Sequence, residues 1–118
     1  MTFSELRTTI RDVEALKLAL TDLGYEVREN DRVRGSFENY GSIRADIIAI
    51  LDRESGDIGW KQNKDGTYTL IADLLGLAKR NNPNELIGSI QKQYEIRVSS
   101  KNLTNDSDNS GQRSKDNE

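Results

Sequence analysis

Basic and aromatic side chains form the most suggestive group in this sequence. Three arginines lie between residues 28 and 34, and Lys61 directly follows Trp60 in a later stretch. Cationic side chains bind phosphate groups and aromatic rings stack on unpaired bases, so a strand face with both is typical of proteins that bind single-stranded nucleic acid. The candidate binding residues are Arg28, Arg32, Arg34, Trp60, Lys61 and Tyr68.

Acidic residues argue against this interpretation. Glu26, Glu29 and Asp31 interleave with the arginines, and 17 basic against 20 acidic residues give the chain a net charge of −3. A field of mixed sign attracts a phosphate backbone poorly, and charged stretches usually form a solvated face. In the alternative interpretation the basic residues are solvated side chains of a strand, and Trp60 belongs to the core.

Three aspartates near strand ends, Asp46, Asp57 and Asp73, are the candidates for acid–base chemistry. A carboxylate enzyme would need a cleft that brings two of them to one substrate. For Asp73 the competing role is to cap a short helix that begins at Leu74. The acidic stretch 52–57 offers oxygen ligands, but it lacks the twelve-residue calcium loop, and a polar turn is the competing interpretation.

Two residue types that carry much of enzyme chemistry are missing, because the sequence has no cysteine and no histidine. Thiolate nucleophiles, zinc–thiolate sites and histidine bases are therefore excluded. The phosphate-binding patterns Gly-x-x-x-x-Gly-Lys and Gly-x-Gly-x-x-Gly do not occur either. We therefore expect no catalytic residue, no metal and no cofactor. The expected function is that of a non-catalytic accessory or adaptor protein that binds another protein.

Two helices are predicted from apolar spacing and from the residues at their ends. Apolar residues recur at helical spacing over residues 13–23, with Asp12 as the N-cap and Gly24 just after the last turn. A second helix is predicted to begin at Pro83, which fits the first helical position, after the capping residue Asn82.

The strands are predicted from alternation and from apolar runs. The stretch 57–73 is a hairpin with a three-residue loop, 64–66, because only an odd loop places Trp60 opposite Leu70 on one face. In the stretch 46–51, apolar residues occupy both the odd and the even positions, and so both faces of a strand. This predicts a central strand that is covered on both faces. The remaining strands are predicted at residues 6–10 and 25–33, with a last short one at 96–98.

These elements predict an α+β fold, with two helices on one face of an antiparallel sheet in the order β-α-β-β-β-β-α-(β). We expect one domain over residues 1–98. Residues 99–118 contain a single large apolar residue, Leu103, so they are predicted to be a disordered polar tail. No stretch is apolar enough to span a membrane and no signal peptide is visible, which predicts a cytoplasmic protein without membrane insertion.

Several pieces of the sequence resemble one family. They are Phe3-Ser4-x-Leu6-x-Thr8-x-Ile10-x-Asp12, Glu14-x-Leu16-Lys17-x-Ala19-Leu20-x-x-Leu23-Gly24, Val33-Arg34-Gly35, Arg44-x-Asp46-Ile47-x-Ala49-Ile50-Leu51, Asp57-Ile58-Gly59-Trp60 and Asn63-x-Asp65-Gly66-x-Tyr68-x-Leu70-Ile71-Ala72-Asp73-Leu74. From about Phe3 to Tyr94 the chain resembles the hypothetical chloroplast reading frame 35 family, uncharacterised proteins of cyanobacteria and algal plastids. The resemblance implies a stand-alone protein of a photosynthetic cell, or of a virus that infects one, in the cytoplasm or the plastid stroma. It implies no catalytic residues.

The end of the chain departs from the family pattern. Family members usually continue past the position of Tyr94 into a segment that ends in an apolar strand, and here polar sequence takes its place. If that strand normally completes the sheet, this chain has an unpaired edge. Such an edge could dock a partner protein or a second copy of the chain, so a homo-oligomer is one expected outcome.

Overall fold

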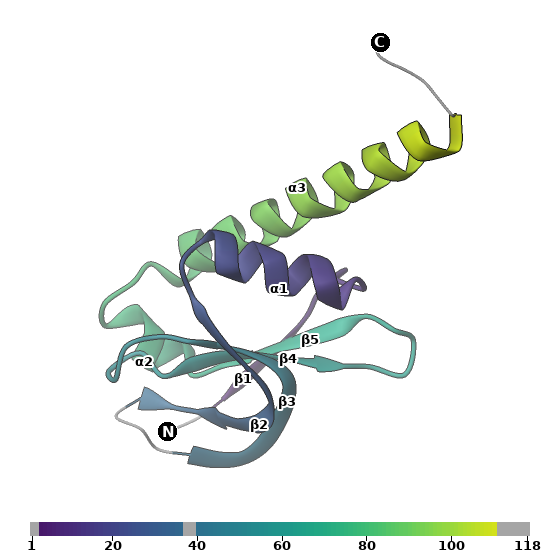
Figure 1. Cartoon of the computed structure of the whole chain (residues 1–118). Coiled ribbons are helices and arrows are strands. Elements are labelled where there is room, and N and C mark those ends of the chain that lie inside the picture. The colour runs from purple at the N-terminus through teal and green to yellow at the C-terminus, as the bar shows by residue number, and fades with distance from the viewer. Residues whose placement is uncertain (1–2, 37–39, 111–118) are drawn as a thin grey trace.

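The computed structural model describes residues 3–36 and 40–110, and its centre is an antiparallel sheet of five strands (Figure 1). The spatial order β1-β5-β4-β3-β2 makes β1 and β2 the edge strands. The predicted α+β class is confirmed, but the apolar stretch 46–51 falls at the end of β3, and β4 occupies the centre of the sheet. The strands are β1 (Ser4–Arg7), β2 (Glu26–Arg34), β3 (Tyr40–Ile50), β4 (Asp57–Gln62) and β5 (Tyr68–Ala72).

The two long helices cover one face of the sheet, as predicted (Figure 1). Both predicted caps are confirmed. Asp12 accepts a hydrogen bond from the backbone N–H of Ala15 at 3.1 Å, and Asn82 accepts one from that of Glu85 at 3.2 Å. Each bond satisfies one of the N–H groups that a helix leaves unpaired at its start. The helices are α1 (Val13–Asp22), α2 (Leu74–Ala78) and α3 (Pro83–Ser110).

The last helix is longer than predicted, and the predicted strand at 96–98 is wrong. Ile90, Tyr94 and Val98 recur every four residues and pack on the core, so they continue one helical face. α3 also covers residues 99–110, for which we expected disorder, and residues 111–118 lie outside the described residues. The division into a domain and a tail at residue 98 stays a prediction.

The hairpin of β4 and β5 has the predicted register. Trp60 pairs with Leu70 and Gln62 pairs with Tyr68, which requires the odd loop between them. Gly66 in this loop has φ +92°, a backbone conformation that side chains with a Cβ rarely adopt. Turn chemistry and side-chain parity therefore specify this part of the sheet together.

The main core lies between the sheet and the helices α1 and α3. The hydroxyl oxygen of Tyr94 on α3 accepts hydrogen bonds from the backbone N–H groups of Arg11 and Asp12, each at 3.0 Å. These bonds fix α3 against the start of α1. The large buried side chains of this core are Ile10, Leu16, Leu20, Ile47, Ile58, Trp60, Tyr68, Leu70, Leu77, Ile90 and Tyr94.

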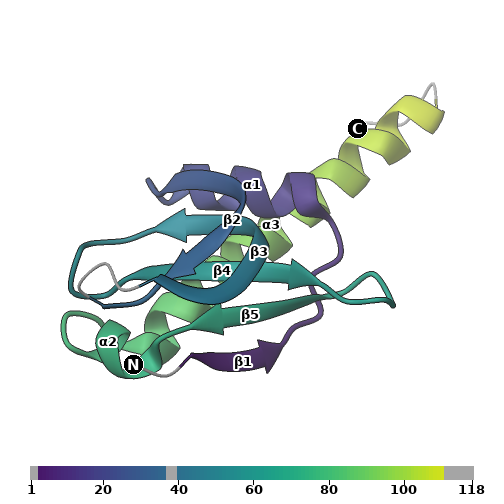
Figure 2. The same cartoon turned by 90° about the horizontal axis from the view of Figure 1, so that it is seen from below.

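The other face of the sheet is covered by the chain's own β2–β3 hairpin. β3 pairs with β4 only from Ile47 onwards, and its earlier residues curl under the sheet together with the end of β2 (Figures 1 and 2). We call residues 31–34 and 40–46 the folded hairpin half. Val33 and Ala45 from this half pack with Ile48 and Ile71 in a second, smaller cluster. The sheet is therefore buried on both faces, as its apolar runs predicted.

A bidentate ion pair joins α1 to α3. Arg97 donates from Nε and Nη2 to the two carboxylate oxygens of Asp22, each at 2.6 Å, and Gln93 donates to Oδ2 at 2.8 Å. These donors, Arg97 first, lower the pKa of Asp22 to about 2. We expect Arg97→Gln to return the pKa of Asp22 towards its ordinary value of 3.8.

The pH dependence of this contact has a defined sign. Because the pKa of Asp22 is lower in the folded chain than the ordinary 3.8, its stabilising contribution is present above pH 3.8 and is lost as the pH falls towards 2. NMR titration of the Asp22 carboxyl carbon measures the shift directly. Lys92→Gln, on an exposed position of α3, is the control and should leave the pKa of Asp22 unchanged. A pKa near 3.8 in the unmodified chain would contradict this assignment.

Candidate functional site

Asp57, at the start of β4, is a charged residue whose side chain is fully buried. Its Oδ2 accepts a hydrogen bond from the backbone N–H of Arg34 at 2.9 Å and lies 3.5 Å from Nη2 of Arg28. Its Oδ1 lies 3.1 Å from Nη2 of Arg34, which also donates to the carbonyl oxygen of Leu51 at 2.7 Å. The Asp57 cluster, made of Arg28, Arg34 and Asp57, therefore ties the folded hairpin half to β4.

Burial dominates the electrostatics of the Asp57 cluster. It raises the pKa of Asp57, and the backbone N–H of Arg34 and the two guanidinium groups act in the opposite direction. Nε of both arginines and Oδ1 of Asp57 are buried without a well-formed hydrogen bond. Arg28 and Arg34 thus neutralise an acidic group of their own chain, which leaves them little capacity to bind a phosphate.

The two aromatic candidates for base stacking are in the core. Trp60 is 1% exposed and Tyr68 is 4% exposed, and burial raises the pKa of the Tyr68 hydroxyl. Both rings point to the face that α1 and α3 cover, so neither can stack on a base in this structure. The interpretation of Trp60 as a core residue opposite Leu70 is confirmed.

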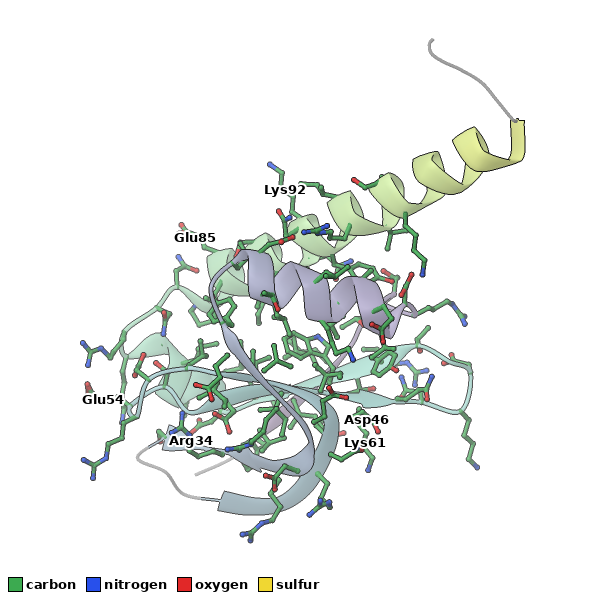
Figure 3. All side chains as sticks on the ribbon, viewed as in Figure 1. Arg34, Asp46, Glu54, Lys61, Glu85 and Lys92 are labelled. Carbon is green, nitrogen blue, oxygen red and sulfur yellow. The ribbon has the colours of Figure 1, made fainter. Side chains whose placement is uncertain are left out.

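The two remaining basic candidates, Arg32 and Lys61, are exposed. Lys61 lines a hollow of about 360 Å³ together with Arg44 and Asp46. Figure 3 shows Asp46 and Lys61 near each other and away from Arg34. The carboxylate in this hollow offsets part of its positive charge. The structure therefore divides the six candidates among an internal cluster, the core and a mixed-charge surface.

The three candidate carboxylates also lie in different environments. Asp57 is enclosed in its cluster, and Asp73 caps α2 by accepting a hydrogen bond from the backbone N–H of Gly76 at 3.1 Å, as its competing role predicted. Asp46 accepts a hydrogen bond from the backbone N–H of Gln62 at 2.7 Å and borders the hollow beside Lys61. Asp46 is thus the member of this set that borders an open space.

The acidic stretch 52–57 forms a turn. Oδ1 of Asp52 accepts hydrogen bonds from the backbone N–H groups of Glu54 and Ser55, at 3.0 Å and 2.9 Å. Glu54 pairs with Arg80 at 2.8 Å. The carboxylates of this stretch are thus used for turn geometry and for an ion pair, which agrees with the competing interpretation as a polar turn.

A second hollow, of about 540 Å³, lies between β1 and α3. We call it the β1–α3 groove. Leu6 projects into it and is 42% exposed, although it pairs with the buried Leu70 of β5. Its lining combines an apolar floor with polar ends and consists of Leu6, Arg7, Thr8, Thr9, Leu70, Ile87, Gln91 and Glu95.

Sequence reasoning missed the β1–α3 groove. The alternation of Leu6, Thr8 and Ile10 with polar residues predicts a strand over 6–10, whereas β1 covers Ser4–Arg7. Alternation also does not say whether a helix covers the apolar face of such a strand. Ile87 on α3 packs against the core, yet only part of its surface is buried. The groove depends on how far α3 lies from β1, and no signal in the sequence reports that distance.

Within residues 3–36 and 40–110, no group of three or more His, Cys, Asp or Glu side chains is arranged to hold a metal ion. Within the same ranges, no helix combines the length and the apolar character needed to cross a membrane.

Comparison with known proteins gives one result. No curated protein and no solved structure matches the chain. A family model matches residues 19–112, which include β2 to β5, α2, α3 and most residues of the main core. A match over this much of the chain shows the family. The chain therefore belongs to the family described as "Protein of unknown function (DUF1257)".

Proposed function

We propose that this protein is a non-catalytic adaptor that binds a partner protein in the β1–α3 groove. The observation that carries the proposal is the exposed Leu6, which stands at the floor of a hollow of about 540 Å³ beside Leu70 and Ile87. Apolar surface gathered in a concave site is typical of binding sites, whereas single exposed apolar residues are common on any surface.

The polar ends of the groove suggest what it would accept. Arg7 borders one side of it, and on α3 the side-chain amide of Gln91 donates to Glu95 at 3.1 Å. A partner segment with an apolar side chain at its centre and polar groups on either side would match this lining. The apolar centre would provide most of the binding free energy, and the polar rim would provide orientation.

The experiment that tests this proposal joins the partner covalently and then measures affinity. A photo-crosslinking amino acid in place of Gln91 captures the protein that fills the groove in cells of the natural source. The identified partner is then purified and titrated by calorimetry against the unmodified chain and against Leu6→Lys. We expect Leu6→Lys to weaken binding at least tenfold, because it places a charge on the apolar floor (about 1.4 kcal/mol per tenfold).

A matched control separates the groove from general surface effects. Leu18 on α1 is 47% exposed and does not line the groove. Leu18→Lys should therefore leave the affinity unchanged. Equal affinities of the unmodified chain and Leu6→Lys would reject the groove as the binding site.

Binding of single-stranded nucleic acid is the second candidate function. The observation in its favour is the hollow that brings Arg44 and Lys61 together, and the observation against it is the burial of Trp60 and Tyr68. Titration of a labelled oligonucleotide at low salt decides between the two functions, because phosphate contacts are strongest there. Binding that falls with added salt and with Lys61→Gln would support this candidate, and no binding would remove it.

We further infer from the resemblance of residues 3–94 to the hypothetical chloroplast reading frame 35 family that the protein acts in a photosynthetic cell or in a virus that infects one. The cytoplasm or the plastid stroma is the proposed compartment. Detection of the protein by antibody in fractionated cells tests this location. Recovery in a membrane or secreted fraction would contradict it.

A further inference from the structure

Among residues 3–36 and 40–110, no strand pairs with the outer edge of β1. Thr8, directly after β1, donates its backbone N–H to the carbonyl oxygen of Tyr68 at 3.1 Å, so this N–H turns towards β5. In an antiparallel pair, residues that turn towards one neighbour alternate with residues that turn away from it. The backbone N–H and C=O groups of Leu6 therefore point towards β5. Those of Glu5 and Arg7 point to the outside of the sheet.

The other edge of the sheet is less regular. Asn30, in the middle of β2, has φ +54°, which interrupts the regular backbone of that strand. The guanidinium group of Arg44 donates to the carbonyl oxygen of Asn30 at 2.6 Å, and the Asp31 carboxylate accepts from the backbone N–H of Arg32 at 2.7 Å. Side chains thus occupy two backbone groups of β2, and the strand is irregular at Asn30, so β2 offers a less regular edge than β1 does.

We propose that a second copy of this chain pairs with β1 in the antiparallel direction, so that the two sheets join into one. Leu6 then lies opposite the partner's Leu6. Glu5 lies opposite the partner's Arg7, and Arg7 lies opposite the partner's Glu5. Four backbone hydrogen bonds form between these residues, because each of them turns its N–H and C=O outward.

The charges of Glu5 and Arg7 favour this register over the two adjacent registers. The outward-facing residues must pair with each other, so the register can shift only in steps that keep Glu5 and Arg7 in hydrogen-bonded positions. One shift places Glu5 opposite the partner's Glu5, and the shift in the other direction places Arg7 opposite the partner's Arg7. Like charges directly opposite each other destabilise a strand pair, whereas opposite charges stabilise it. Only the proposed register has two attractive pairs.

The present partner of Arg7 does not prevent this pairing. Arg7 lies 3.4 Å from Asp65 of its own chain, and both side chains are more than half exposed. An exposed ion pair of this kind contributes little to stability, so the Arg7 side chain is able to turn to the partner's Glu5.

The proposed pair goes beyond the adaptor function and does not depend on it. A two-fold axis that relates antiparallel strands of one continuous sheet keeps the same face of both copies on the same side. The two β1–α3 grooves therefore lie next to each other, with the two Leu6 side chains between them. A partner protein would then meet a longer groove than one chain provides.

Sedimentation equilibrium of the full chain over a range of concentrations tests the proposal. A pair of four-residue strands buries less area than the roughly 1,200 Å² of stable interfaces, so we expect a dimer with a Kd of about 10–100 µM. Glu5→Arg turns two attractive pairs into two repulsive ones and should raise the Kd roughly tenfold. The double variant Glu5→Arg, Arg7→Glu exchanges the charges and should restore the original Kd.

Two further variants complete the test. Glu26→Arg makes the same change of charge on the other edge strand, β2, and should leave the Kd unchanged. Arg7→Pro removes an outward N–H group without touching the bonds to β5, and should abolish the dimer. A monomer at every concentration, a dimer weakened equally by Glu26→Arg, or failure of the double variant to restore the Kd would overturn the proposal. Since Glu5 does not line the groove, an effect of Glu5→Arg on the dimer is distinct from a loss of partner binding.

Discussion

Gly59→Val is expected to lower the free energy of unfolding by about 3 kcal/mol, at the upper end of the cost of overpacking a core. A Cβ atom at Gly59 would lie 2.7 Å from Cγ2 of Val33 and 2.8 Å from the Cβ of Ala45. Both neighbours are buried in the folded hairpin half, so neither can move without lifting that half off the sheet. Strand propensity alone predicts the opposite, because valine is favoured in strands and glycine is not.

Chemical denaturation monitored by circular dichroism measures this change in stability. Gly88→Ala is the matched control, since nothing lies within 4 Å of the Cβ that it adds. In the interior of α3 this control should raise the free energy of unfolding by about 0.5–1 kcal/mol. A Gly59→Val chain as stable as the unmodified one would show that the folded hairpin half does not pack on β4.

Asp57→Ala is expected to cost about 3 kcal/mol of stability, as removal of one partner from a buried ion pair commonly does. The change removes the acceptor of the Arg34 backbone N–H and the carboxylate beside two guanidinium groups. Asp57→Asn keeps an oxygen acceptor for the backbone N–H of Arg34 but removes the negative charge beside the two guanidinium groups. It should therefore lower the free energy of unfolding by less than Asp57→Ala does, because the hydrogen bond is retained.

The pH dependence of the same variants gives an independent measurement. Because burial raises the folded-state pKa of Asp57 above 3.8, this group contributes stability below pH 3.8 that is lost as the pH rises through the folded-state pKa. The advantage of the unmodified chain over Asp57→Asn should therefore narrow as the pH rises. Unfolding free energies of both chains at several pH values test this. An advantage that widens with pH would mean that the arginines outweigh burial.

Local patterns were sufficient for much of the fold. The cap at Asp12 and the register that pairs Trp60 with Leu70 follow from residue types and side-chain parity over short distances. The folded hairpin half does not follow from such patterns. It depends on the contact of Val33 and Ala45 with Gly59, and a glycine in a strand does not reveal which distant segment approaches it.

The candidate site shows the same division. Alternation placed Trp60 and Tyr68 on one face of the hairpin, which is correct, but it could not decide whether helices or solvent cover that face. Sequence patterns also could not predict the ion-pair partner of Arg28 and Arg34. That partner is the Asp57 carboxylate, which is more than twenty residues away in sequence. The groove beside Leu6 depends on the distance between β1 and α3, for which sequence spacing gives no measure.

The bonds between the Tyr94 hydroxyl and the N–H groups of Arg11 and Asp12 have a consequence for biosynthesis. The ribosome releases α1 long before α3, and β1 must likewise wait for β5, its neighbour in the sheet. Until Tyr94 has left the exit tunnel, the apolar side of α1 that holds Leu16 and Leu20 lacks its cover. The nascent chain therefore exposes the apolar side of α1 until α3 has been synthesised, and exposed apolar surface of this kind is what chaperones bind.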